Sequence, residues 1–173
     1  MMARRAVVLL PLLAAAVLAG CAHAGSRVQL AEGADFARLR RIGVMPFQGV
    51  GDKGAVVAKD IEEGLKGAGY EIVDEKLLER AMAGHRMDSD FGYGLEAAAD
   101  VRIQTGADAV LVGRVARDWS AAFIIMMETE MGDKVLSGVV KPEKKGEKVF
   151  KGPDELARTI TGIFARIAGK AGF

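Results

Sequence analysis

The chain has 173 residues, with 24 lysines and arginines against 23 aspartates and glutamates, for a formal net charge of +1. This balance indicates neither a nucleic-acid partner nor a polybasic membrane patch. One cysteine and two histidines exclude an internal disulfide framework and a histidine-rich metal site. We therefore expect no bound metal and no cofactor.

The first twenty residues have the pattern of an export signal. Two arginines are followed by fourteen apolar residues that are interrupted only by Pro11, and small residues precede Cys21. The apolar run is shorter than the roughly 20 residues that a transmembrane helix needs. We expect a signal peptide over residues 1–20, with cleavage between Gly20 and Cys21.

Leu18-Ala19-Gly20-Cys21 resembles the lipobox of bacterial lipoproteins. The resemblance implies that Cys21 becomes the first residue and carries diacylglycerol and an acyl chain such as palmitate, so membrane lipid is an expected partner. Ala22 stands where an aspartate would favour retention at the inner membrane. This implies a lipid anchor in the outer membrane, with the domain facing the periplasm. An ordinary signal peptide with a chance cysteine is the alternative.

The segment after the signal predicts a lipidated N-terminus and short tether over residues 21–39. It has no sustained periodicity, although one helical turn is expected near residues 34–39. Fully extended, Ala22–Arg38 would reach only about 60 Å. The folded domain, expected over residues 40–173, would therefore act near its own membrane.

The first part of the domain predicts strands that alternate with helices. Apolar residues recur every four positions at Val57, Ile61 and Leu65, which predicts a helix. Three strands and three helices are expected, over residues 40–47, 55–68, 70–74, 75–83, 95–105 and 109–115. Because a strand, a helix and a second strand follow one another, we expect parallel pairing.

The last part predicts an antiparallel hairpin and a final helix. An apolar stretch over 119–131 precedes a turn and a strand over 135–140, a short edge strand is expected at 148–150, and a helix begins at Pro153. The expected fold is one α/β (α+β) domain. It has a mixed sheet of about five strands, two strand–helix units, a C-terminal hairpin and a covering helix.

A glycine-rich loop matches the dinucleotide fingerprint G-x-G-x-x-G. Gly49, Gly51 and Gly54 follow a strand and precede a helix, and Asp74 ends the next strand. However, three residues separate the strand from the first glycine, and strand–helix repeats are too few for a complete dinucleotide fold. Small-ligand or nucleotide binding here is the alternative to a loop whose glycines serve only the backbone.

No set of residues in the sequence predicts catalysis. Asp88-Ser89-Asp90 lacks the spacing and the final glutamate of a calcium loop, and nearby His85 has no nucleophile elbow beside it. Met126, Met127 and Met131 are expected to fill the core. We therefore expect a chain that is not an enzyme.

Four stretches from Arg41 onward resemble the envelope family that contains CsgG, the N-terminal domain of TolB and LpoB. The residues that carry the resemblance are Ile42-Gly43-Val44-Met45-Pro46-Phe47, Val57–Leu65 with Tyr70–Asp74 and Leu77-Leu78, Gly106-Ala107-Asp108 running into Ala109–Gly113, and Glu130–Leu136. The resemblance covers about residues 40–168.

The resemblance implies a non-catalytic binding or assembly module whose partners are other envelope proteins. A homo-oligomer is also implied, and the apolar hairpin agrees with one. A curli pore needs two long transmembrane hairpins, whereas this chain offers one short hairpin, so pore formation is not expected. Expected partner surfaces are the 49–54 loop, the 84–93 loop with the aromatic residues Phe91 and Tyr93, and a basic strip. The strip comprises Lys141, Lys144, Lys145, Lys148 and Lys151.

Overall fold

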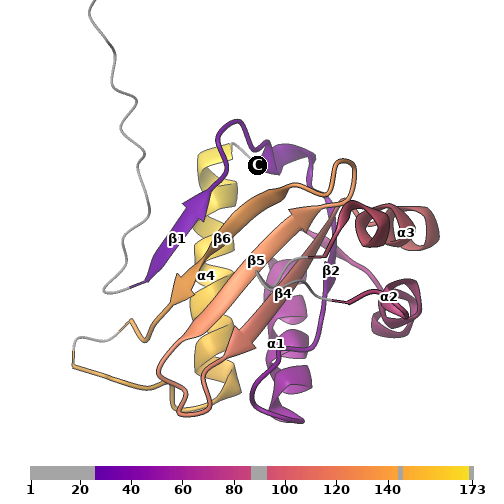
Figure 1. The fold of residues 1–173 in the computed structure, drawn as a ribbon. Helices are drawn as coiled ribbons and strands as arrows, with labels where there is room; N and C mark the ends of the chain where they lie inside the picture. Colours follow the sequence, from indigo (N-terminus) through magenta and orange to yellow (C-terminus); the bar gives the residue numbers. More distant parts are fainter. Residues whose placement is uncertain (1–25, 87–92, 144–145, 172–173) are drawn as a thin grey trace, which may run out of the picture.

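The computed structural model describes residues 26–86, 93–143 and 146–171, which form one α+β domain around a six-stranded mixed sheet (Figure 1). The elements are β1 (Arg27–Leu30), η1 (Phe36–Arg38), β2 (Arg41–Val44), α1 (Lys53–Gly67), β3 (Glu71–Ile72), α2 (Glu75–Met82), α3 (Leu95–Thr105), β4 (Ala109–Val115), β5 (Ala122–Glu128), β6 (Lys134–Val140) and α4 (Pro153–Ala171). The expected fold class is confirmed, with six strands rather than about five.

The sheet has the strand order β1-β6-β5-β4-β2-β3. Strand β2 pairs in parallel with both β3 and β4, as the strand–helix units predict. From β4 onward the pairing is antiparallel through β5 and β6 to β1. The mixed sheet thus arises from two parallel crossovers followed by a meander.

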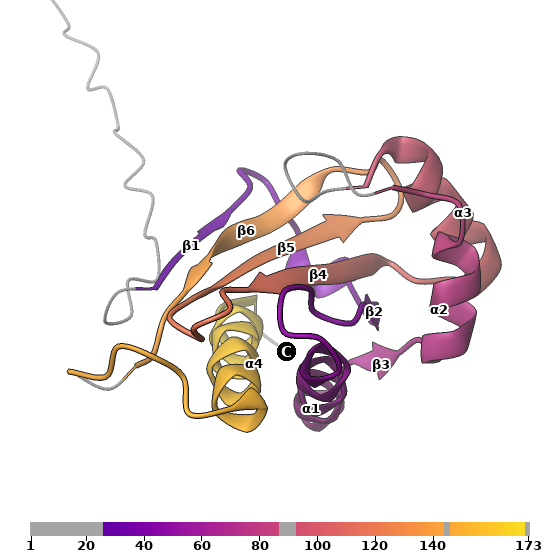
Figure 2. The ribbon, with the colours of Figure 1, turned by 60° about the horizontal axis from the view of Figure 1, so that its bottom comes forward.

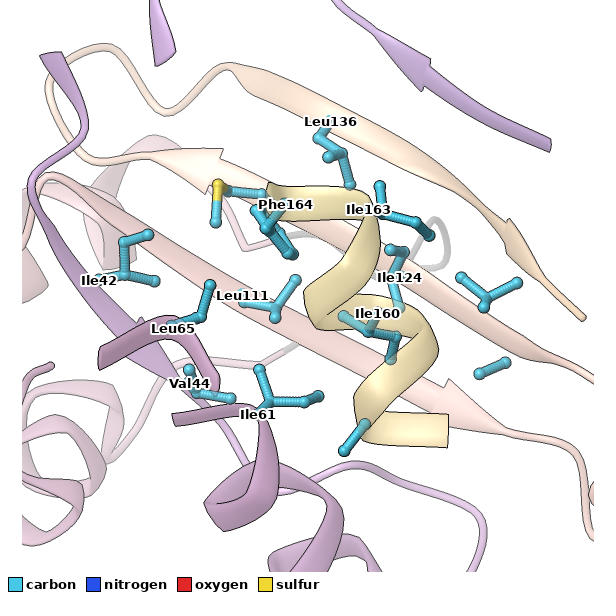
Figure 3. Packing of buried hydrophobic residues seen from close by; sticks show 14 of the residues in the cluster. Ile42, Val44, Ile61, Leu65, Leu111, Ile124, Leu136, Ile160, Ile163 and Phe164 are labelled. Carbon is cyan, nitrogen blue, oxygen red and sulfur yellow. The ribbon is translucent and has the colours of Figure 1, made fainter. Parts of the chain in front are cut away.

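Helices lie on both faces of the sheet. Figure 2 shows α1 and α4 side by side against one face, while α2 and α3 lie at the other side near β2 and β4. Figure 3 shows the larger core, where Leu111 and Ile124 of the sheet meet Ile61 of α1 and Phe164 of α4. Each of these side chains is at most 1% exposed. Burying a side chain of this size contributes about 1.5–3 kcal/mol.

Strand β1 corrects the prediction that residues 21–39 form a tether. β1 pairs with β6, and the side chains of Val28, Phe36 and Leu39 are 5–6% exposed. The helical turn expected near 34–39 is present as η1. The folded domain therefore includes residues from Ser26 onward and not only those from residue 40, while residues 1–25 lie outside the described part.

Two smaller expectations were also wrong. The segment 148–150 is not a strand, although Phe150 is buried and its amide donates to the carbonyl of Trp119 at 2.8 Å. Met126 and Met127 fill the core, but Met131 is 64% exposed in the turn after β5.

Among the helices of the described residues, none is long and apolar enough to cross a membrane.

Candidate functional site

The end of the sheet where β1 begins is the part of the domain nearest to Cys21 in the chain. Ser26 is 3% exposed, and its hydroxyl both accepts from the amide of Lys141 at 2.9 Å and donates to the Lys141 carbonyl at 3.2 Å. We call this the Ser26 end. Gly20 and Cys21 themselves lie outside the described residues, so the lipid site stays a prediction.

The glycines of the 49–54 loop serve the close packing of the chain on itself. A Cβ at Gly49 would overlap the carbonyl oxygen of Val115, and a Cβ at Gly54 would overlap that of Phe47. Gly49 and Gly51 also have positive φ angles of 95° and 58°. Backbone geometry therefore accounts for all three glycines without a phosphate.

Asp74 also has a structural role. It is the N-cap of α2, where its Oδ1 accepts from the amide of Leu77 at 3.1 Å. Asp74 thus serves the fold, and the charged pocket described below includes neither Asp74 nor the three glycines.

In the 84–93 loop, Phe91 lies outside the described residues, while Tyr93 is half-buried. Tyr93 packs against the core on the α2–α3 side, its amide donates to the sulfur of Met127 at 3.1 Å, and burial raises the pKa of its phenol. Tyr93 is therefore only partly exposed, and its place at a partner surface stays a prediction, as does that of Phe91.

His85 connects this loop to α3. Its Nε2 lies 2.8 Å from Oδ2 of Asp100, and its side chain is 20% exposed. This contact joins the start of the loop to α3, which gives the histidine a structural role. Among the described residues, no group of three or more histidine, cysteine, aspartate or glutamate side chains could hold a metal ion.

A charged pocket of about 260 Å³ lies at the opposite end of the sheet from Ser26. Its charged lining residues are Glu32, Asp35, Arg38, Arg102, Asp108, Glu128, Glu130 and Asp133. Six of these eight carry carboxylates, so the pocket favours a cationic group.

Some of the pocket carboxylates are already used by the fold. Oδ2 of Asp108 accepts from the amides of Arg40 and Arg41, each at 2.8 Å, and thereby fixes the start of β2 beside β4. Glu130 lies 3.6 Å from the guanidinium of Arg38. By contrast, Glu32 and Asp133 are exposed on the rim. The rim carboxylates are therefore the groups best placed to meet a partner.

No pattern in the sequence predicts this pocket. Its residues come from the β1–η1 connection, the end of α3 and the β5–β6 turn. No motif joins these segments, and β1 itself was not predicted. The signal that was available is the acidic character of the 128–133 turn, which carries Glu128, Glu130 and Asp133.

No protein-family model and no curated protein matches the chain. The PelC dodecamer from Paraburkholderia phytofirmans is a similar solved structure, with 17% identity and a TM-score of 0.45, covering 84% of this chain and 96% of that one. Lipoprotein GNA1162 from Neisseria meningitidis has 18% identity and a TM-score of 0.46, covering 74% and 96%.

E. coli LpoB, solved by NMR, has 17% identity and a TM-score of 0.41, covering 58% of this chain and 56% of that one. LpoB is one of the proteins that the four sequence stretches resemble, whereas the likeness to CsgG and TolB stays a prediction. Identities this low leave the function to be argued from the residues of this chain.

Proposed function

We propose that this chain is an outer-membrane lipoprotein, anchored through Cys21, whose periplasmic domain binds other envelope proteins without catalysing a reaction. Secretion, surface-structure assembly and cell-wall maintenance are the processes that such a module would serve. The observation that carries the proposal is the short distance along the chain between the lipobox and the folded domain.

Only five residue steps separate Cys21 from Ser26, which is fixed in the domain by its bonds to Lys141. Fully extended, five steps span roughly 18 Å. This is much less than the about 60 Å that a tether to residue 38 would give. The domain would therefore meet partners close to its own membrane.

The charged pocket is the surface that this arrangement would leave facing away from the membrane, because it lies at the opposite end of the sheet from Ser26. Its exposed rim residues Glu32 and Asp133 suit a partner segment that carries lysine or arginine. Exposed charges of this kind raise the rate of association and the specificity of binding more than they raise the affinity. A buried apolar anchor would have to supply the rest of the binding energy.

The anchor is tested by processing and fractionation in intact cells. Globomycin treatment or Cys21→Ser should block lipoprotein processing and remove the mature lipidated form. Ala22→Asp should move the protein from the outer to the inner membrane, while Ala24→Asp is a matched control that should leave it in place. Unchanged processing and unchanged outer-membrane fractionation in Cys21→Ser would overturn the anchor.

The partner surface is tested with photo-crosslinking amino acids at Glu32 and Asp133, and at exposed Lys59 of α1 as a control position. We expect adducts with another envelope protein from the two rim positions and not from Lys59. Recovery of the protein itself alone would reduce the proposal to self-assembly. Equal adducts from all three positions would overturn the pocket as the partner surface.

Small-ligand or nucleotide binding at the 49–54 loop is the second candidate. It would require the glycines to be open to a ligand, but the carbonyls of Phe47 and Val115 lie where Cβ atoms would project from Gly54 and Gly49. Calorimetric titration with nicotinamide cofactors should therefore give no heat of binding. Saturable heat would restore this candidate.

A further inference from the structure

We propose that the partner of the charged pocket is a protein segment in which apolar residues stand beside lysine or arginine. Its apolar residues would dock on the α3 strip, defined as Leu95, Ala99 and Ile103 of α3 together with Met131 of the β5–β6 turn. The proposal rests on the protein-binding function proposed above. It names the chemistry of the partner and supplies the apolar contact that the charged rim lacks.

Helix α3 carries apolar residues on two sides. On its inner side, Ala97 and Val101 are at most 2% exposed and pack in the core on this face of the sheet. On its outer side, Leu95, Ala99 and Ile103 follow at four-residue intervals and are therefore neighbours along the helix. Leu95 is 59% exposed and Ile103 is 81% exposed. A surface helix ordinarily turns polar residues to its outer side, so the strip indicates a face that a second molecule covers.

The α3 strip is continuous with the charged pocket through the β5–β6 turn. Figures 1 and 2 both show this turn beside α3. A Cβ built on Gly132 in the turn would lie 3.4 Å from Cδ1 of Leu95. Arg102, which lines the pocket, donates from Nη1 to Oγ1 of Thr129 at 3.5 Å. Met131 lies in the same turn and is 64% exposed, so apolar and acidic side chains share one surface.

Large exposed apolar side chains gather at this surface. The described residues contain six of them, and Leu95, Ile103 and Met131 belong to the α3 strip. A fourth, Leu30, directly precedes Ala31, which lines the charged pocket. Single exposed apolar residues are ordinary on a protein surface, whereas a group of them beside polar residues is typical of a binding site.

The charge of the pocket decides which partner fits. Six of its eight charged residues are carboxylates, so a purely apolar partner would cover them without supplying a counter-charge, which is costly. In a symmetric dimer through this surface, the carboxylates of one copy would approach those of the other and repel them. A segment with lysine or arginine beside its apolar residues avoids both costs.

The first test needs a chain without lipid, so that no detergent competes for the α3 strip. Residues 21–173 with Cys21→Ser meet this need and include every described residue. The probe is a synthetic peptide in which leucine and lysine recur at helical spacing, and surface plasmon resonance gives its association and dissociation rates. The same peptide with glutamate in place of lysine should bind at least about ten-fold more weakly, because like charges meet at the pocket. Equal binding of both peptides, or binding of neither, would overturn the proposal.

Paired substitutions in this chain locate the apolar contact. Leu95→Gln with Ile103→Gln should weaken binding of the lysine peptide at least about five-fold, mainly through faster dissociation. Val56→Gln with Val149→Gln is the matched control, since it replaces two exposed apolar side chains outside this surface and should leave binding unchanged. Both pairs should unfold in urea at the midpoint of the parent, because all four side chains are exposed. Equal loss of binding in both pairs, or no loss in either, would overturn the proposal.

The second test separates this proposal from the protein-binding function. A photo-crosslinking amino acid at Asp133 of the full-length protein is used in intact cells, with and without each pair of substitutions. The adduct with another envelope protein should fall several-fold with Leu95→Gln and Ile103→Gln but not with the control pair. An undiminished adduct would leave the protein-binding function standing and overturn the α3 strip as its contact.

Two other outcomes of the cellular test would overturn the proposed partner. Adducts with the protein itself would assign the surface to a second copy. Such a copy could offer the basic strip expected from the sequence, of which Lys144 and Lys145 lie outside the described residues. No adduct from Asp133 in the parent protein would contradict the protein-binding function, and the α3 strip with it.

Discussion

The ring of Phe47 occupies the space into which a side chain at position 113 would project. Phe47 is 2% exposed just after β2, and a Cβ built on Gly113 in β4 would overlap its ring atoms. Gly113→Ala should therefore destabilise the fold by about 1–3 kcal/mol, because the ring has to move within a packed core. Urea unfolding measures the change.

A double-mutant cycle separates this overlap from a general effect of alanine in β4. Phe47→Leu alone leaves a gap and should destabilise the fold. The loss of stability in the double variant with Gly113→Ala should be smaller than the sum of the losses in the two single variants. If the two losses of stability are strictly additive, the Phe47 ring does not restrict the size of the side chain at position 113.

Gly64 has a similar relationship with Thr161, between α1 and α4. A Cβ at Gly64 would overlap Cγ2 of Thr161, whose hydroxyl is held by the carbonyl of Ala157 at 3.0 Å. Gly64→Ala should lower stability by about 1–2 kcal/mol, since overpacking outweighs the gain of about 1 kcal/mol in helix propensity. Thermal unfolding measures the change.

Gly67 is the matched control, because it ends the same helix and no atom lies within 4 Å of its added Cβ. Gly67→Ala should leave stability unchanged or raise it. Thr161→Ala should restore part of the stability lost in Gly64→Ala. If Gly64→Ala proves as stable as Gly67→Ala, the packing of α1 against α4 leaves room for a methyl group at position 64, which would contradict the prediction.

The parts of the fold that the sequence predicted well have local signals. The bounds of α3 and β4 agree with the expected 95–105 and 109–115, since Gly106 ends the helix with a positive φ of 67° and an apolar run fills the strand. The buried face of α4 likewise follows from its four-residue spacing.

The parts that were missed depend on contacts between distant residues. In β1 only Val28 is buried, and the strand exists because it pairs with β6, more than a hundred residues later. The charged pocket depends on β1 in turn, so it could not be predicted without it. For the anchor the opposite holds: the whole signal is in the sequence, and Cys21 lies outside the described residues.

Val28 tests whether β1 is part of the folded domain in solution. Its side chain is 6% exposed and belongs to the larger core, so Val28→Ala should cost about 1–3 kcal/mol in urea unfolding. Gln29→Ala changes an exposed neighbour in the same strand and should stay within about 0.5 kcal/mol. Equal, small effects at both positions would show that β1 does not contribute to the stability of the domain and would support the original prediction of a tether.

Glu62 gives the fold a predictable dependence on pH. Burial raises the pKa of its carboxyl above the ordinary 4.5, and nearby Glu75 and Asp74 add to the effect while Lys66 opposes it. A raised pKa means that the folded state binds this proton more tightly than the unfolded state, so ionised Glu62 opposes folding. This cost is present at neutral pH and is lost as the pH falls through the raised pKa and below 4.5.

Glu62→Gln should therefore raise the melting temperature at pH 7, and the advantage should shrink as the pH is lowered until it vanishes below 4.5. The exposed neighbour Glu63 offers the same change of charge in Glu63→Gln, which relieves no burial and should have the smaller effect at pH 7. Thermal unfolding of both variants across this pH range measures the difference. An advantage of Glu62→Gln that stays constant, or that grows as the pH falls, would contradict burial as the cause, because protonation in both states removes the cost that the substitution is meant to relieve.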